Sequence, residues 1–451
     1  MSAAECTAKL GCCYAPAPVS RGDAPLRLPD CFKPNGGAST YAAAAGATTA
    51  TLPAKGQLTS TASAAPTLGP DVSPLDFEVA LLAPDVARVS LSAPGRWRLP
   101  ASVLPGAAGV AAAAKGDGRP PLLDVAVEGS PFGVVVRRAN TSSASSSSAS
   151  SAPPLLDTRP HRLVFKDHYI ELTTSLPATS SVYGLGERTA STPTLPLRRD
   201  GVPLALWARD SAAADADVNT YASWPAAWVV GEDGGASAIV LLTSNGLDVV
   251  LTRDALTFRV TGGVVDLLVL AGPTPADVAR QLAAVTGRPT LQPLWAFGLM
   301  NSKYGYASAA QTERVLDSYE AAGVPLEAWV SDSQYMKDDA AFTWSDDFDR
   351  AAMASFVRRL HASGRRWVPI LDPVIRATRG YAPYDDGLAG GVFVTDVRGD
   401  PYVGQMWPGA TVWPDFLDNA ASDAWWGRLI DGLGRAVGGV DGEEGGRERG
   451  V

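Results

Sequence analysis

Short apolar runs, separated by glycine, proline and aspartate, recur between residues 75 and 282. They include FEVALL (77–82), FGVVVRR (132–138), LDVVLT (247–252) and VVDLLVLAG (264–272). Runs of this length that are rich in valine, isoleucine and leucine, with turn residues between them, are typical of strands in an antiparallel sandwich. We therefore predict a β-sandwich over residues 71–274.

One loop of this region, residues 204–225, is long and contains Trp207, Asp210, Tyr221 and Trp224. Aromatic rings together with a carboxylate suit a sugar ligand, because a sugar ring offers C–H faces and hydroxyl groups. A long loop that packs on its own sandwich explains the same residues equally well.

After residue 275 the pattern changes to alternating strands and helices. We expect a connecting helix over 275–287, a buried strand over 294–300, and a helix over 308–323 that begins at a capping box of Ser308 and Gln311. The apolar runs 326–330 and 367–373 predict two further strands. The helix between them ends at Gly364, which suits a left-handed cap, and its apolar stripe consists of Met353, Phe356, Val357 and Leu360.

A long insertion, residues 381–416, precedes a last expected helix over 422–434. One wide apolar face of that helix consists of Trp425, Trp426, Leu429, Ile430 and Leu433. Strands joined by single helices form parallel sheets, and repeated units with long loops on one side indicate an eight-fold (β/α)8 barrel. We assign residues 275–442 to this barrel.

Two aspartates occupy matching places in these units. Asp332 follows the strand of residues 326–330, and Asp372 ends the run of residues 367–373. Since α/β folds bind ligands at the carboxyl ends of their strands, both carboxylates are candidates for a binding site. The alternative is that each aspartate only caps a loop.

Residues 36–70 differ from both regions, because they consist mainly of alanine, threonine, serine and glycine without a period. This composition predicts a flexible linker.

Composition and charge exclude several classes of function. The 451 residues are 46% hydrophobic and have a net charge of -9, which argues against a nucleic-acid partner. No apolar run is long enough for a membrane span. The three histidines are scattered and the four cysteines lie near the N-terminus, so the sequence indicates neither a metal site nor a cofactor.

The cysteines Cys6, Cys12, Cys13 and Cys31 lie in a segment with few apolar residues, which disulfides would have to hold. The run GCCY followed by PDCF resembles the second half of a P-type trefoil domain, and we assign residues 1–35 to it. The resemblance implies a Cys6–Cys31 disulfide, and two further cysteines and any signal peptide upstream of this sequence. A cytosolic thiol cluster is the alternative.

Several motifs together resemble glycoside hydrolase family 31, the α-glucosidases of lysosomal acid and intestinal type. They are SPFGVVVRR (130–138), SVYGLGER (181–188), YGYASAAQT (304–312), SDSQYM (331–336), PILDPVI (369–375) and MWPGATVWPDF (406–416). The family implies a partial trefoil, a galactose mutarotase-like β-sandwich and a barrel. It also implies hydrolysis of terminal non-reducing α-linked glucose with retention, in carbohydrate metabolism, with maltose or malto-oligosaccharides as substrates. It places such enzymes in the secretory pathway, extracellular or lysosomal or vacuolar.

The resemblance also implies roles for particular residues. Asp332 matches an aspartate that binds sugar hydroxyls, and Asp210 matches a residue that reaches the neighbouring sugar site. Aromatic and strand-end positions of the same pocket match Tyr304, Trp407, Ile370 and Asp372, of which Asp372 supports the site rather than touching the sugar. Gln334 departs from the family, which usually has an acidic residue there.

The family needs two catalytic carboxylates, one of them in a W-x-D-M-N-E motif on the fourth barrel strand. This sequence follows the family to Asp441 and Gly442 and then continues as EEGGRERGV (443–451), with Gly446 near the expected nucleophile position. We therefore expect an incomplete barrel with the sugar-binding part of the site and no catalytic residue. The alternatives are a non-catalytic carbohydrate-binding protein and, within the family, an α-xylosidase or an N-glycan-trimming glucosidase.

Overall fold

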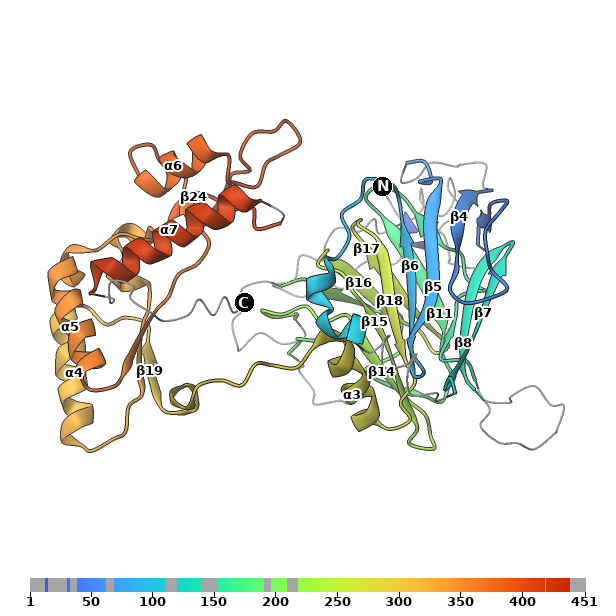
Figure 1. The fold of residues 1–451 in the computed structure, drawn as a ribbon, viewed down its shortest axis with the longest axis horizontal. Coiled ribbons are helices and arrows are strands. Elements are labelled where there is room, and N and C mark those ends of the chain that lie inside the picture. Colours follow the sequence, from blue (N-terminus) through green and yellow to red (C-terminus); the bar gives the residue numbers. More distant parts are fainter. Residues whose placement is uncertain are drawn as a thin grey trace. The chain divides into compact units, whose positions relative to one another are not determined.

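The computed structural model describes residues 39–61, 69–109, 120–139, 153–189, 196–208, 218–417 and 419–438, together with the backbone of residues 13–14 and 31–32. The chain divides into two compact units, Met1–Pro289 and Thr290–Val451, which Figure 1 shows in blue to yellow and in yellow to red. None of the described helices is long and apolar enough to cross a membrane.

The first unit is a β-sandwich with sheets of eight, five and three strands, as expected (Figure 1). The largest has the order β12 (Ser181–Gly184), β14 (Ala226–Val230), β15 (Ala236–Leu241), β18 (Val265–Leu270), β6 (Val86–Ser92), β5 (Leu75–Ala83), β4 (Ala54–Ser60) and β3 (Tyr41–Ala43). The five-stranded sheet has the order β10 (Val164–Phe165), β11 (Ile170–Ser175), β17 (Ala255–Val260), β16 (Leu247–Leu251) and β13 (Pro203–Leu206). The smallest consists of β7 (Leu123–Gly129), β8 (Phe132–Arg138) and β9 (Leu156–Asp157).

Alternation along the strands explains why β15 and β18 are buried on both faces. On β18, Leu267 and Val269 belong to the core between the sheets, whereas Leu268 and Leu270 point to the opposite face. That opposite face is covered by helix α3 (Pro275–Thr286), which follows β18 directly. A strand covered on both sides has a continuous apolar run rather than an alternating one, which is why VVDLLVLAG is so apolar.

Helix α3 therefore belongs to the sandwich and not to the barrel, so the predicted domain boundary at residue 275 is wrong. Gln281 fixes the helix to the end of β18: it accepts a hydrogen bond from the Gly272 N–H (3.0 Å) and donates one to the Gly272 carbonyl (2.7 Å). Thr274 and Asp277 form a capping box at its start. The division between the two compact units falls between residues 289 and 290 of the chain instead.

The predicted linker over residues 36–70 is also corrected, because β3 and β4 lie within it and form the end of the largest sheet. Tyr41 is fully buried, and its hydroxyl lies 2.9 Å from the Val72 carbonyl and 3.1 Å from the Phe165 carbonyl. Nearby, Lys166 and Asp71 form a buried ion pair of 2.5 Å. One aromatic residue and its distant partners thus hold a segment whose composition predicts no structure.

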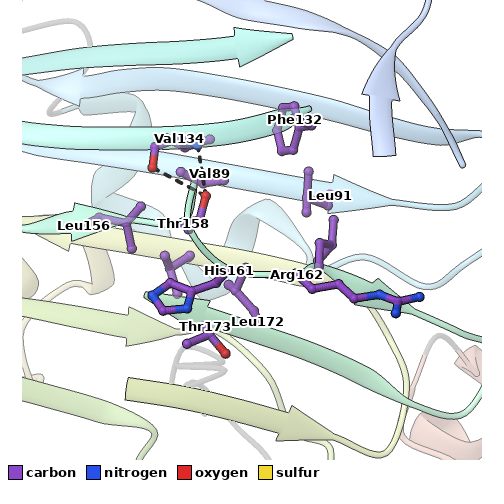
Figure 2. Close-up of a pocket in the computed structure, with 12 residues that line it drawn as sticks. Val89, Leu91, Phe132, Val134, Leu156, Thr158, His161, Arg162, Leu172 and Thr173 are labelled. Carbon is purple, nitrogen blue, oxygen red and sulfur yellow. Dashed lines mark hydrogen bonds between the residues drawn. The ribbon is translucent and has the colours of Figure 1, made fainter. Parts of the chain in front are cut away.

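The sandwich encloses a small cavity of about 20 Å³ (Figure 2). Its lining is mainly aliphatic, with Phe132, Thr158, His161 and Arg162 among the other side chains. Thr158 is turned to the backbone of Val134, whose N–H donates to its hydroxyl at 2.9 Å. A cavity of this volume holds about one water molecule, so it offers no room for a sugar.

The second unit begins with three parallel strands in the order β19 (Met300–Lys303), β20 (Ala328–Ser331) and β21 (Arg366–Pro369). Helix α4 (Ala309–Ala321) joins the first two strands and α5 (Arg350–Ala362) joins the second pair. Both predicted helices are confirmed, and Gly323 and Gly364 after them have φ of 63° and 77°, the left-handed values that glycine adopts without strain. Met353, Phe356, Val357 and Leu360 are fully buried, as the stripe predicted.

One predicted strand of this unit is wrong. Residues 294–300 do not form a buried strand: Leu294–Phe297 is a short 3-10 helix (η2), and β19 begins only at Met300. Leu294 is 88% exposed. Pro293 and Gly298 flank this turn, and both residue types interrupt a strand.

The insertion after β21 forms its own small layer. Strands β22 (Ile375–Arg376), β24 (Gly409–Val412) and β23 (Gly404–Met406) make an antiparallel sheet beside helices α6 (Ala382–Gly390) and α7 (Ala420–Ala436). Three short 3-10 helices, η3 (Ser333–Tyr335), η4 (Lys337–Asp339) and η5 (Asp346–Phe348), lie between β20 and α5. On α7, Trp425 and Leu433 are buried as predicted, whereas Ile430 is 40% exposed, so the apolar face is narrower than expected.

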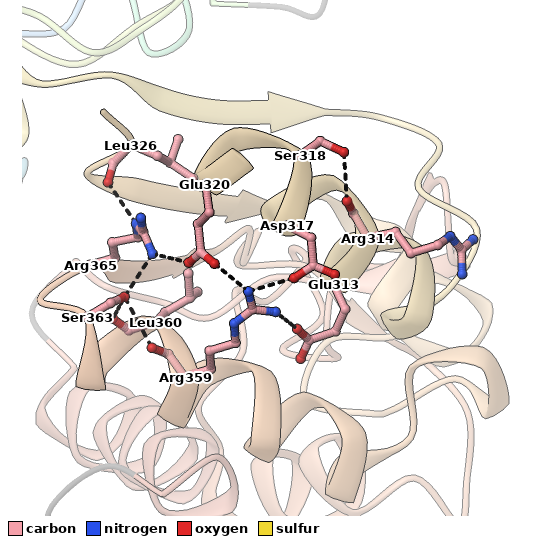
Figure 3. A network of polar contacts seen from close by, with 10 residues as sticks. All are labelled: Glu313, Arg314, Asp317, Ser318, Glu320, Leu326, Arg359, Leu360, Ser363 and Arg365. Atoms are coloured by element: carbon pink, nitrogen blue, oxygen red, sulfur yellow. Dashed lines mark hydrogen bonds and ion pairs between the residues drawn. The ribbon is translucent and has the colours of Figure 1, made fainter. Parts of the chain in front are cut away.

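A polar network joins α4 to α5 (Figure 3). The guanidinium of Arg359 on α5 contacts three carboxylates of α4, those of Glu313, Asp317 and Glu320. Arg365 contacts Glu320 as well, at 2.7 Å, and donates to the Leu326 carbonyl ahead of β20. The network fixes the two helices that position the strand ends.

The predicted trefoil falls largely outside the described residues. Within it, β1 (Cys13–Tyr14) pairs antiparallel with β2 (Cys31–Phe32). Cys6 and Cys12 lie outside the described residues, so the Cys6–Cys31 disulfide stays a prediction.

Candidate functional site

The candidate site lies where β20 and β21 end. These strands are parallel, with Ser331 opposite Pro369, and the Ile370 N–H donates a hydrogen bond to the Ser331 carbonyl at 2.9 Å. Asp332 follows β20 directly, and Asp372 lies three residues beyond the end of β21. The sequence therefore predicted correctly that both carboxylates stand at the same edge of the sheet.

The pKa of the Asp372 carboxyl depends on Asp332. Burial raises the pKa of the Asp372 carboxyl, and the negative charge of Asp332 raises it further. Asp332 also caps η3, because its carboxylate accepts a hydrogen bond from the Ser333 N–H at 2.7 Å. This bond fixes the direction of the Asp332 side chain. A half-buried pair of this kind can accept hydrogen bonds from neutral hydroxyl groups.

A buried aromatic cluster supports the strand ends from below. Tyr335 is fully buried, and its hydroxyl donates to the Ile370 carbonyl at 2.9 Å. Its ring lies 5.9 Å from that of Trp367 and 5.6 Å from that of Trp344. The Trp367 indole N–H in turn donates to the Ser331 hydroxyl at 2.9 Å. These bonds fix Ile370 beside Asp372 and define the base of the site.

Tyr304 stands at the end of β19, the third strand of the same edge. Its side chain is 74% exposed. The next residue, Gly305, has a φ of 95° and donates its backbone N–H to Oε1 of Gln334 at 3.0 Å. Lys303 pairs with Ser331, so Tyr304 and Asp332 follow the same rung of the ladder, and the exposed ring adds a flat apolar surface to an edge that also has polar acceptors.

Trp407 lies in the turn between β23 and β24 and is half exposed. Strand β24 pairs with β22, which begins three residues after Asp372. The pairing therefore connects this hairpin to residues that follow the strand end closely. Its contact with a ligand stays a prediction. Asp210 lies outside the described residues, and its role stays a prediction too.

Two features of the site were missed by the sequence. One is the cluster of Tyr335, Trp344 and Trp367, whose members are up to 32 residues apart along the chain. The other is the hydrogen bond between the Gly305 N–H and the Gln334 side chain, which no local sequence pattern predicts. Among the described residues, no group of three histidine, cysteine, aspartate or glutamate side chains is arranged to hold a metal ion.

Comparison with known families assigns both units. Residues 76–247 match the glycosyl hydrolase 31 N-terminal galactose mutarotase-like domain, and residues 289–442 match the glycosyl hydrolases family 31 TIM-barrel domain. The match to the second domain begins beside the boundary at residues 289 and 290, which agrees with the placement of α3 in the first unit.

Curated relatives agree with these matches. A probable alpha-glucosidase of Oryza sativa subsp. japonica is 36% identical over 380 residues, which are 80% of this chain and 41% of that protein. The lysosomal alpha-glucosidase of Bos taurus is 38% identical over 316 residues, 68% of this chain and 32% of its own length. Alpha-xylosidase 1 of Arabidopsis thaliana is 35% identical over 272 residues, which are 59% of this chain and 29% of that protein. The chain spans less than half the length of these relatives.

Among solved structures, a glucosidase II alpha subunit superposes with a TM-score of 0.70 at 18% identity, covering 89% of this chain and 50% of that one. At this identity the likeness shows the fold.

Proposed function

Because this chain belongs to glycoside hydrolase family 31, we propose that it carries the glucose-binding part of an α-glucosidase active site. The observation that supports the proposal best is the edge at β19, β20 and β21, where Asp332 and Asp372 stand near an exposed Tyr304. A carboxylate pair and a ring are the groups that a terminal glucose unit requires.

In this proposal the Asp332 carboxylate accepts hydrogen bonds from hydroxyls of the non-reducing glucose. Hydrogen bonds to a charged acceptor are stronger than those between neutral groups, and the Ser333 N–H holds the acceptor in place. Tyr304 and Trp407 present their rings to the apolar C–H faces of the sugar. Ile370 and Asp372 form the wall behind the sugar. Asp210 of the sandwich loop contacts the next sugar residue of the substrate.

The reaction that we propose for the active site is hydrolysis of terminal α-linked glucose with retention. Such a reaction uses one carboxylate as nucleophile and a second as acid and base. Neither Asp332 nor Asp372 is assigned these roles, and the 451-residue sequence contains no W-x-D-M-N-E motif. We therefore expect this polypeptide alone to bind sugar without cleaving it.

The experiment follows from this division. Maltose binding to the 451-residue polypeptide is measured by calorimetry, and glucose release from maltose is measured on the same sample. Saturable binding without release supports the proposal. Release at a rate comparable to an α-glucosidase contradicts the assignment of the catalytic groups, and the absence of maltose binding contradicts the proposed site.

A non-catalytic carbohydrate-binding protein is the second candidate, because the groups at this strand edge are suited to binding a sugar and none of them is assigned a catalytic role. Binding alone does not separate the two candidates. The transcript from the same gene does: a coding sequence for that motif in frame after Gly442 supports the α-glucosidase, and a stop codon there supports the binding protein.

The substrates proposed are α-glucosides such as maltose and malto-oligosaccharides. Two of the relatives described above are α-glucosidases by name and one is an α-xylosidase, so α-xylosides are the closest competing substrates. Competition of maltose with an α-xyloside in the calorimeter ranks the two. We also propose the secretory pathway as the compartment, with a lysosomal or vacuolar destination, on the strength of the lysosomal relative.

A further inference from the structure

The turn that carries Tyr304 is held at its tip by a side chain from another strand end. Gly305 donates its N–H to Oε1 of Gln334 at 3.0 Å, across 29 positions of sequence. Gly305 has a φ of 95°, so the turn adopts a conformation that favours glycine. Because Tyr304 is the preceding residue, this bond also restrains the backbone from which the Tyr304 ring projects.

The backbone of Gln334 is itself fixed. Its carbonyl accepts a hydrogen bond from the Ser345 hydroxyl at 3.0 Å, and the neighbouring Tyr335 is fully buried. The Ser345 N–H also donates to the Tyr335 carbonyl at 2.8 Å, so Ser345 is hydrogen-bonded to two consecutive carbonyls of this turn. Gln334 is therefore a firmly placed acceptor.

Both ends of the Tyr304 turn are anchored as well. Before it, Lys303 pairs with Ser331 in the parallel ladder. After it, Tyr306 is buried, and its hydroxyl and the Asn301 side chain are hydrogen-bonded at 3.1 and 3.2 Å. Between these anchors Tyr304 is largely exposed, so the bond from Gly305 is the contact at the tip that limits its motion. A ring that is already in place loses less entropy when a ligand stacks on it.

The Gly305–Gln334 hydrogen bond, here called the tether, has an uncharged acceptor. An amide oxygen accepts the Gly305 N–H as a carboxylate would, but it carries no charge. The negative charge of Asp332 already raises the pKa of the Asp372 carboxyl at this edge, and a third carboxylate would add to the repulsion. Glutamine provides the acceptor and leaves two negative charges at the site.

We propose that Gln334 is a positioning residue, which holds the Tyr304 ring ready to stack on the sugar and does so without adding a third negative charge. The inference rests on the proposed function of the site. It differs from that function because it concerns a residue that does not touch the sugar and acts through Tyr304.

The test measures maltose affinity and backbone amide exchange on the full 451-residue chain. Gln334→Met keeps the length of the side chain and removes the acceptor. We expect a three- to ten-fold weaker maltose affinity, roughly the effect of one hydrogen bond, and faster exchange of the Gly305 amide. Gln334→Glu restores the acceptor and should bring the exchange of the Gly305 amide back to within about two-fold of the original chain, whereas its added negative charge should raise the pKa of the Asp372 carboxyl further, as carboxyl carbon NMR titration would measure. Gln292→Met, at an exposed glutamine outside the site, is the matched control.

The coupling to Tyr304 separates positioning from a general effect on folding. Tyr304→Ala should weaken maltose binding, and the double variant Tyr304→Ala with Gln334→Met should bind no more weakly than Tyr304→Ala alone, because the tether then has no ring to hold. Additive losses in the double variant would overturn the inference. If Gln334→Met fails to fold, Gln334→Asn takes its place, since its amide is one methylene short of the turn.

Failure of the inference and failure of the proposed function give different results. If the original chain binds maltose and Gln334→Met binds it equally well, Gln334 is not a positioning residue and the site stands. If the original chain does not bind maltose, the proposed function is wrong and the inference falls with it, whatever the amide exchange shows.

Discussion

The negative charge of Asp332 adds to the rise that burial causes in the pKa of the Asp372 carboxyl. The two residues come from consecutive parallel strands, so their proximity is a property of the sheet edge. It makes the ionisation of one carboxyl depend on the presence of the other.

Replacing Asp332 by asparagine tests this coupling. Asp332→Asn removes the second cause, so the pKa of Asp372 should move down toward its ordinary value, as carboxyl carbon NMR titration would measure. If Asp332 also binds sugar hydroxyls, maltose binding should weaken by roughly 1.5 to 3 kcal/mol, the range for a hydrogen bond to a charged group. Asp347→Asn, an exposed carboxylate on the same connection, should change neither. An unaltered Asp372 titration would show that the two groups are independent.

The buried ion pair of Lys166 and Asp71 predicts a loss of stability of the sandwich when the cation is removed. Lys166→Met leaves the Asp71 carboxylate buried with the Ser60 hydroxyl (3.0 Å) but without its cation. Removing one partner of a buried pair typically costs about 3 to 5 kcal/mol, so urea unfolding should show a loss on that scale. Lys55→Met, an exposed lysine of β4, serves as control. Equal stability of both variants would show that the ion pair does not stabilise the sandwich.

Asp248 predicts a pH dependence of the sandwich. The residue is 4% exposed, and its Oδ1 has no hydrogen-bond partner among the described residues. It lies beside Arg259, which is paired with Glu171 on the next strand. Burial raises the pKa of Asp248 to about 6, and the charges of Arg259 and Arg188 only partly oppose this rise. Tyr169, the remaining titratable neighbour, donates its hydroxyl to Glu171.

The sign of the effect follows from these values. The folded chain holds a proton on Asp248 between about pH 4 and pH 6, where the unfolded chain has already released it, so stability falls as the pH rises through this window. Asp248→Asn is neutral throughout. Its free energy of unfolding should match the original chain near pH 4 and exceed it near pH 7 by up to about 3 kcal/mol. Urea unfolding at several pH values measures the difference, with the exposed Asp124→Asn as control. A difference that does not vary with pH would contradict the prediction.

The network of Figure 3 predicts a smaller and salt-dependent effect. Arg359→Met removes three ion pairs between α4 and α5, but the guanidinium is about one-third exposed, and pairs of this kind contribute from zero to about 1 kcal/mol each. We expect a loss of about 1 kcal/mol in the free energy of unfolding at low salt, and a smaller loss in 1 M NaCl, where the charges are screened. The neighbouring Arg358→Met should have less effect. A loss that is equal at both salt concentrations would point to packing of the side chain rather than its charge.

Local patterns in the sequence determined the elements that depend on their own residues. The apolar runs of β5, β16 and β18 and the stripe of α5 are visible because burial on one or both faces imposes a period of two, a continuous run or a period of 3.6. The places of Asp332 and Asp372 followed in the same way, since each residue comes within three positions of the end of a recognisable strand and parallel strands end at one edge.

Tertiary structure decided what depends on distant partners. Residues 41–43 look like linker, and they become a strand because the Tyr41 hydroxyl meets carbonyls 31 and 124 positions away. The run 294–300 is apolar enough for a strand, but its ladder with the neighbouring strand begins only at Met300. The Gly305–Gln334 bond joins two loops whose separation in sequence carries no sign of contact. Periodicity reports only which side of an element is buried, whereas these contacts depend on the positions of groups that only the folded chain brings together.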